Sequence, residues 1–156
     1  MIRFFPLLLA LASAGCVFQN MQMTERLQDQ VYALNDETRW GRIDLAAQRV
    51  VPAYRSRFLE LHQGWGTSVQ VAETELTNLA LAEDGQSAAA LVSVSWYDMQ
   101  SMEAHTTHLR QRWTKSDGPF ALAGEEIVGG EPSLFESGEG GGETAPDDGI
   151  SPLAAR

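Results

Sequence analysis

Between Thr24 and Gly64, apolar residues recur three or four positions apart, which predicts helices. The first helix begins at Thr24, and its apolar face is formed by Leu27, Val31 and Leu34. Asn35 or Asp36 is expected to cap a second helix, because short polar side chains accept hydrogen bonds from the first free amides of a helix. Two successive helices are therefore expected before Pro52.

Proline and glycine limit these helices. Gly41 weakens the start of the second helix, and Pro52 ends it. The apolar positions of this helix are Trp40, Ile43, Ala47, Val50 and Val51. Pro52 is well placed to open a third helix, since proline fits the first helical position. Gly64 stops that helix, whose apolar side carries Tyr54, Phe58 and Leu61. Three helices are thus predicted in succession.

After Gly66 the pattern changes from helical to alternating, which predicts strands. The expected strands cover 67–81, 87–97, 102–115 and a shorter segment that contains Phe120 and Leu122. The alternation shifts between Val71 and Leu76, which predicts a β-bulge. Helices followed by hairpin-linked strands predict an α+β domain, with helices packed on a curved four-stranded antiparallel meander.

A trial register assigns the two faces of this sheet. A three-residue turn at 83–85 pairs Glu75 with Ser93, and a turn at 98–101 pairs Ser93 with Thr106. One face is then largely apolar and suits the helices, whereas the other is polar. We expect the polar face to meet solvent or a partner, including a second copy of the chain, through Glu73, Glu75, Tyr97, His108, Arg110 and Arg112.

Composition separates the end of the chain from the rest. Residues 129–156 hold seven of the 14 glycines and several acids, which predicts a disordered acidic tail after a domain at 23–128. The formal net charge of −10 disfavours binding to nucleic acid. The 44% apolar content is ordinary for a globular protein.

The N-terminus has the pattern of an export signal. Arg3 precedes the short apolar run Phe4–Ala12, which is too short to span a bilayer, and small residues follow it. Ser13-Ala14-Gly15-Cys16 resembles the lipobox of bacterial lipoproteins, although serine replaces the usual leucine. The resemblance implies that residues 1–15 are a signal peptide, that Cys16 is lipidated, and that 16–22 form a short linker. Val17 after the cysteine implies the periplasmic face of the outer membrane.

The domain itself resembles a second family. Glu37-Thr38-Arg39-Trp40-Gly41, the helix at 54–61, and Gln111-Arg112-Trp113 before Gly118 and Phe120 resemble nuclear transport factor two-like domains. The resemblance covers 23–128 and implies a cystatin-like cone whose sheet and helices enclose a pocket, with dimers formed through the sheet. It does not choose a function, because this fold carries enzymes, binding modules and scaffolds.

Candidate site residues follow from these patterns. Aromatic and amide side chains that can line a small hydrophobic pocket, or form core, are Trp40, Tyr54, Phe58, Trp65, Trp96, Gln111 and Trp113. His105 and His108 point to opposite faces of one strand, so they cannot chelate one metal ion together. No metal site and no cofactor is predicted.

No catalytic residues are predicted. An acid–base site needs converging groups, whereas Asp98 lies at a turn, Asp44 lies on a helix face, and the interior offers chiefly Gln111 and Thr107. We therefore expect a lipid-anchored envelope protein with a non-catalytic domain that binds an envelope protein or a small hydrophobic ligand. The alternative is a pocketed enzyme of the isomerase, dehydratase or cyclase type.

Overall fold

A computed structural model describes residues 14–115 and 118–136 of the chain, with side chains from residue 21 onward. The helical elements are α1 (Ala14–Arg39), α2 (Ile43–Ala46), the 3-10 helix η1 (Ala47–Arg49) and α3 (Pro52–Leu61). The strands are β1 (Val69–Leu81), β2 (Ser87–Asp98), β3 (Ala104–Thr114) and β4 (Ala121–Gly130), followed by the 3-10 helix η2 (Pro132–Phe135). The predicted α+β class, with helices before an antiparallel sheet, is confirmed.

The four strands form a meander in the order β1-β2-β3-β4. The predicted pairing of Glu75 with Ser93 is confirmed, and β1 is irregular at two places, after Val71 and after Leu76. The second hairpin differs from the prediction by two residues, because Ser93 pairs with His108 rather than Thr106. Its connection is longer than expected. A shift of two preserves the side-chain alternation, so the predicted faces survive.

The turn between β2 and β3 explains this shift. The Asp98 carboxylate accepts hydrogen bonds from the amides of Gln100 (2.7 Å) and Ser101 (3.0 Å), and the Met102 amide donates to the Asp98 carbonyl at 2.8 Å. Met102 takes a φ of 61°, which reverses the chain. Asp98 thus organises a wider turn than alternation alone indicates.

The predicted helix cap at Asn35 or Asp36 is wrong, because α1 continues through both residues to Arg39. The Asn35 side chain donates to the Val31 carbonyl one turn back (2.8 Å), so it does not serve as a cap. The helix ends at Arg39, and Gly41, two residues further on, takes a φ of 68° that turns the chain away. A Cβ at Gly41 would lie 3.1 Å from the Gly66 Cα, so glycine also permits this close approach.

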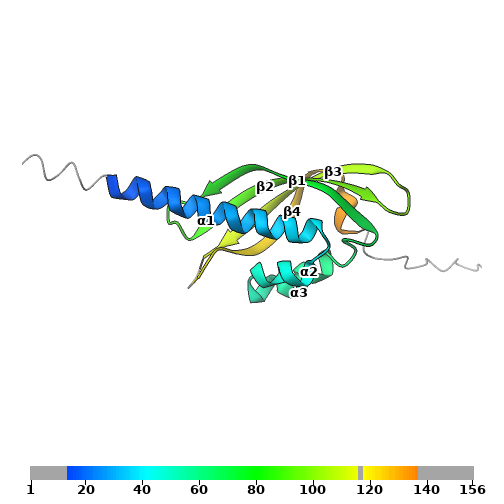
Figure 1. The fold of residues 1–156 in the computed structure, drawn as a ribbon, viewed down its shortest axis with the longest axis horizontal. Coiled ribbons are helices and arrows are strands. Elements are labelled where there is room, and N and C mark those ends of the chain that lie inside the picture. Colours follow the sequence, from blue (N-terminus) through cyan, green and yellow to red (C-terminus); the bar gives the residue numbers. More distant parts are fainter. Residues whose placement is uncertain (1–13, 116–117, 137–156) are drawn as a thin grey trace, which may run out of the picture.

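The beginning of α1 differs from the expected short linker. Residues 16–22 are helical, so they advance about 10 Å at 1.5 Å per residue and do not span the longer distance open to an extended chain. The first turns of α1 project past the end of the sheet (Figure 1). The expected signal sequence lies largely outside the described residues. Within the described part, we find no helix with the length and apolar character needed to cross a membrane.

The predicted boundary between domain and tail at 128/129 is also wrong. β4 is ten residues long and runs to Gly130, and η2 then places Leu134 in the core with 1% of its surface exposed. The glycines of this segment accommodate neighbouring side chains, since Gly129 lies under the His108 ring and Gly124 under the Arg112 guanidinium. The rest of the predicted tail, 137–156, lies outside the described residues.

The helices cover one face of the sheet, and the core lies between the two layers (Figure 1). α1 contributes Leu27, Val31 and Leu34, which are fully buried. The sheet contributes Trp96 and Trp113, each only 1% exposed. These two indoles are among the largest fully buried side chains, so they fill much of the inner face.

Candidate functional site

A line of hydrogen-bonded polar side chains crosses the inner face of the sheet. The Gln111 amide of β3 exchanges two hydrogen bonds with the Asn35 amide of α1, at 3.0 and 3.2 Å. Gln111 Nε2 also donates to Glu125 Oε1 of β4 at 3.0 Å. The other oxygen of Glu125 lies 3.6 Å from His62 Nε2, next to the C-terminus of α3. Asn35, Gln111, Glu125 and His62 form a cluster that we call the inner polar line.

His62 and Glu125 are a buried acid–base pair, since each side chain is 1% exposed. His62 Nδ1 lies 2.9 Å from the Phe58 carbonyl oxygen, which can only accept a hydrogen bond. Nδ1 therefore carries a proton. In the neutral imidazole, Nε2 is then a bare acceptor that faces Glu125 Oε2.

Burial favours the neutral form of both partners. It lowers the pKa of His62 to about 4, opposed by the hydrogen bond to the Phe58 carbonyl. It raises the pKa of Glu125 to about 7, opposed by the hydrogen bond from Gln111. The separation of 3.6 Å is too long for a strong charge-assisted hydrogen bond, so between about pH 4 and 7 we assign the pair as a protonated carboxylic acid beside a neutral imidazole.

Aromatic rings enclose the imidazole of His62. Its centroid lies 4.2 Å from the Phe58 ring in a stacked geometry, 4.4 Å from Trp65 and 5.4 Å from Phe135 of η2. The Tyr54 hydroxyl accepts a hydrogen bond from the Glu125 amide at 3.1 Å. Burial and the nearby carboxyl raise the pKa of Tyr54 to about 12. This environment excludes water from the pair and explains its shifted pKa values.

The chemistry available to this pair is proton transfer. Perturbed titratable groups concentrate at functional sites, although structural pairs show similar shifts. Among the described residues, the side-chain atoms buried without a hydrogen-bond partner are Glu125 Oε2, Trp65 Nε1 and Trp113 Nε1. The first two of these unpaired atoms belong to side chains that contact His62. The side chains around Glu125 Oε2 and Trp65 Nε1 are buried and packed against one another.

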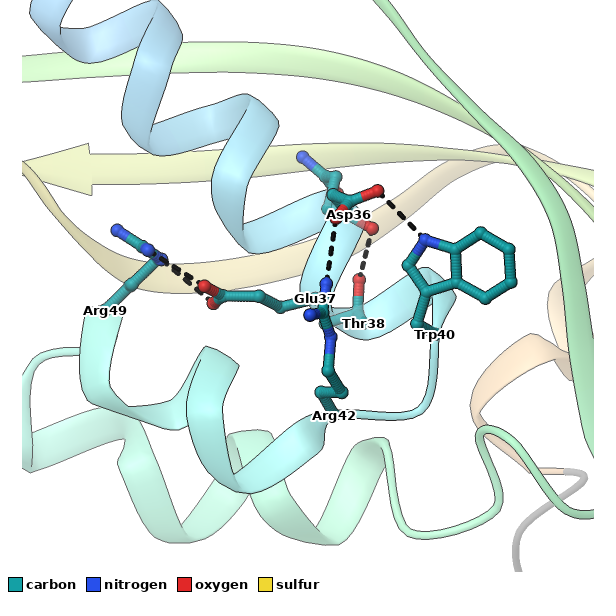
Figure 2. Close-up of polar contacts among 7 residues, drawn as sticks. Asp36, Glu37, Thr38, Trp40, Arg42 and Arg49 are labelled. Carbon is teal, nitrogen blue, oxygen red and sulfur yellow. Dashed lines mark hydrogen bonds and ion pairs between the residues drawn. The ribbon is translucent and has the colours of Figure 1, made fainter.

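A second polar cluster fixes the corner between α1 and η1 (Figure 2). The Glu37 carboxylate, 8% exposed, accepts two hydrogen bonds from the Arg49 guanidinium at 2.8 and 2.9 Å. Asp36 pairs with Arg42 at 2.9 Å and accepts from the Trp40 indole at 3.1 Å. Since these groups satisfy one another, the cluster holds the helices together and presents no free reactive group.

The seven predicted pocket residues occupy different environments. Six lie inside the fold, namely Phe58, Trp65, Trp96, Gln111 and Trp113, which are buried, and Tyr54, which is half-buried. Trp40 does not join them, because 61% of its surface is exposed at the end of α1. The Trp96 indole donates to Thr107 Oγ1 at 3.0 Å, so Thr107 has a structural partner. A common pocket for these residues stays a prediction.

The residues of the predicted partner face are exposed, and they alternate along the strands with the buried residues that face the helices. β1 carries Glu73 and Glu75, and β3 carries His108, Arg110 and Arg112. Tyr97 of β2 is 42% exposed. Arg110 pairs with Glu126 of β4 at 2.9 Å, and both side chains are about half exposed. Ser93 of β2 lies between Glu75 and His108, and Ser95 lies beside Glu73.

Sequence reasoning missed three members of the inner polar line. His62 follows the last residue of a helix, and Glu125 stood near the predicted tail. Gln111 was the residue from which these partners could have been found, because a side-chain amide on an apolar sheet face needs buried hydrogen-bond partners. Extending the register to β4 pairs Gln111 with Glu125. The described residues contain no group of three or more His, Cys, Asp or Glu side chains suited to a metal ion.

Comparisons with known proteins do not assign this chain to a family. No family model and no curated protein matches the chain. One solved structure, the intermembrane space region of the chloroplast protein ARC6, is similar over 70% of this chain and 93% of its own length. It is 11% identical with a TM-score of 0.37, a likeness too low to carry an argument about fold or function.

Proposed function

We propose that this chain is an exported, lipid-anchored envelope protein whose nuclear transport factor two-like domain binds a partner or ligand without catalysis. The carrying observation is the contrast between the two sheet faces. The inner face is packed with Trp96 and Trp113, while the outer face is open and bears opposite charges on β1 and β3. A protein that recognises a partner through its surface needs an exposed face with complementary charges, as on the outer side of this sheet, and does not need an open active site.

The anchor in this proposal is lipid on Cys16, at the periplasmic face of the outer membrane. Cys16 lies within α1, whose helical start would hold the domain at a defined distance from the bilayer. Several acyl chains on one residue anchor a protein stably, whereas one chain is marginal. The lipobox-like sequence Ser13-Ala14-Gly15-Cys16 supports this placement.

The cone assignment rests on the order of elements. Three helices precede a four-stranded meander, and α1 lies across the inner face of the sheet. In this proposal, two copies associate through the outer face, with the acidic β1 of one copy against the basic β3 of its partner. A two-fold axis makes such a face self-complementary.

Photo-cross-linking in membranes tests the partner face, with p-benzoylphenylalanine in place of the exposed Tyr97 in the wild-type chain and in each variant. The intact chain is expected to give a product of twice its mass, the Arg110→Glu variant to lose it, and the Arg110→Glu/Glu73→Arg double variant to recover part of it. A product that is unaffected by Arg110→Glu contradicts association through this face. The absence of any product from the wild-type chain contradicts self-association.

The alternative function is an enzyme of the isomerase, dehydratase or cyclase type. It is favoured by one observation, the buried His62–Glu125 pair with shifted pKa values. Diethyl pyrocarbonate distinguishes the two functions, because it modifies accessible imidazoles. The binding module predicts rapid modification of exposed His108 and protection of His62, read by peptide mass analysis. Rapid modification of His62 would instead favour an accessible catalytic site.

A further inference from the structure

The sheet has two edge strands, β1 and β4, and the rest of the fold covers them differently. The start of α3 covers part of the edge of β4. The Leu122 carbonyl accepts a hydrogen bond from the Val51 amide at 2.9 Å. Further along this strand, the Glu125 amide donates to the Tyr54 hydroxyl at 3.1 Å. At these two positions, the outward backbone groups of β4 therefore find partners within the fold.

On β1, the loop after α3 covers the first residue of the strand. The Val69 amide donates to the Gly64 carbonyl at 2.9 Å, and the Val69 carbonyl accepts from the Gly66 amide at 2.8 Å. Within the described part of the chain, the backbone of residues 73–81 bonds to β2 alone. Alternate residues of an edge strand turn their N–H and C=O groups away from the neighbouring strand. Residues 73–81 therefore present a row of backbone donors and acceptors with which a further strand can pair.

The inner side of this edge is only partly buried. Leu76, Leu79 and Leu81 pack against the core but keep part of their surface exposed. The β2 residues with which these leucines pair are at most 9% exposed. The apolar inner row of the sheet thus continues to the edge, and apolar side chains on an added strand would bury the rest of the leucine surface.

The outer side of the same edge is acidic. Glu73 and Glu75 are exposed, and within the described residues neither has a cationic partner within 4.0 Å. Charge disfavours two occupants that this chain could supply. Residues 137–156 contain four acids and one arginine, and a second copy of β1 would bring the same two glutamates to the edge. A basic segment of another protein has the complementary charge.

We infer that residues 73–81 of β1 bind a short extended segment of a partner protein in which basic and apolar residues alternate. The segment adds a fifth strand to the sheet through backbone hydrogen bonds. Its basic side chains lie beside Glu73 and Glu75, and its apolar side chains continue the inner row of leucines. The irregularity after Leu76 leaves two regular stretches of four residues, which suits a short segment and opposes long strand pairing. This inference rests on the proposed binding function and names a partner class for it, at the edge of the sheet instead of its outer face.

Fluorescence anisotropy with a synthetic peptide tests this inference on the full chain. The probe is a fluorescein-labelled heptapeptide of alternating lysine and valine that begins and ends with lysine. One control peptide has glutamate in place of lysine. A second control is N-methylated at two adjacent central residues, which removes an amide proton from each edge of the peptide strand and keeps its charge. We expect saturable binding of the probe, and binding about tenfold or more weaker for each control peptide.

Charge variants of the chain test the acidic side of the site. Glu73→Gln/Glu75→Gln is expected to weaken binding of the probe about tenfold, because two opposite charges are lost beside its lysines. The matched control Asp44→Asn/Glu60→Gln removes two exposed acids on α2 and α3 and should leave the affinity within about twofold.

Hydrogen exchange, read by mass analysis of fragments, locates the added strand. The probe is expected to slow exchange in 73–81 and to leave exchange in 121–130 unchanged, because new backbone hydrogen bonds protect amides at the β1 edge.

Five results overturn the inference. The first three are the absence of saturable binding, equal binding of the N-methylated peptide, and equal weakening by the control variant. The fourth is unchanged exchange in 73–81 when the probe is added. The fifth is protection of 73–81 that grows with chain concentration without the probe, which identifies a second copy as the occupant. None of these results removes the proposed outer-face function, which fails through the photo-cross-linking and histidine-modification outcomes.

Discussion

Replacing either member of the His62–Glu125 pair should reveal a pH dependence of stability that the wild-type pair largely conceals. The pKa of Glu125 rises from 4.5 to about 7 on folding, so its contribution to stability is fully present below pH 4.5 and is lost as the pH rises through 7. The pKa of His62 falls from 6.5 to about 4, so its contribution is present above pH 6.5 and is lost as the pH falls through 4.

Proton counting gives the magnitude. Between about pH 4.5 and 6.5, the folded pair holds one proton on Glu125 and the unfolded pair holds one on His62, so the stability due to the pair is flat. One pKa unit corresponds to about 1.4 kcal/mol. As the pH rises from 4.5 to 7, the unfolding free energy of Glu125→Gln should therefore increase by about 3 kcal/mol relative to that of the wild type. As the pH rises from 4 to 6.5, the unfolding free energy of His62→Phe should decrease by about 3 kcal/mol relative to that of the wild type.

The assay is urea unfolding followed by tryptophan fluorescence at half-unit pH steps, with the wild type measured in parallel. Taking the difference from wild type cancels the titration of all other groups when these are unchanged. Glutamine at 125 can keep the acceptor for Gln111 and offer an amide to His62 Nε2, so the fold should persist. If the pair is instead ionic, both slopes reverse sign, and that result would refute the neutral assignment.

Three substitutions test the packing account by urea unfolding. Gly41→Ala should cost about 1–3 kcal/mol, because φ is positive and the added Cβ meets the Gly66 backbone; an unchanged midpoint would show that the helix end relaxes freely. Leu134→Ala should cost about 2–5 kcal/mol, against less than about 1 kcal/mol for the more exposed Leu59→Ala, and equal costs would remove η2 from the core. Arg49→Gln should cost about 1–3 kcal/mol, because the buried carboxylate that it pairs with loses its cation while Arg49 itself is partly exposed; a neutral outcome would show that water replaces the guanidinium.

The order of elements and the two sheet faces were predictable from periodicity. Alternation placed Trp96 and Trp113 inward, and both are buried. The end of α1 was not predictable from capping preferences, because Asn35 has a tertiary partner in Gln111 that sequence spacing does not show. The close approach of Gly41 and Gly66 that accompanies the end of the helix is likewise a contact between distant segments.

The candidate site was harder to predict than the fold. His62 and Glu125 are 63 positions apart, and they meet only after α3 packs against β4. The predicted tail began at residue 129 because the segment is rich in glycine. Composition alone cannot distinguish the glycines of a linker from glycines of β4 that leave room for side chains of β3. Gln111 was assigned to the interior by its parity, yet its partners depended on the full register.

The measurement that tests the central proposal most directly is the intact mass of the chain recovered from the membrane fraction of a Gram-negative host. The proposal predicts the loss of residues 1–15 and added acyl mass on Cys16, with both changes abolished in Cys16→Ser. An unmodified Cys16 in soluble protein would contradict a lipid-anchored binding module at the membrane surface.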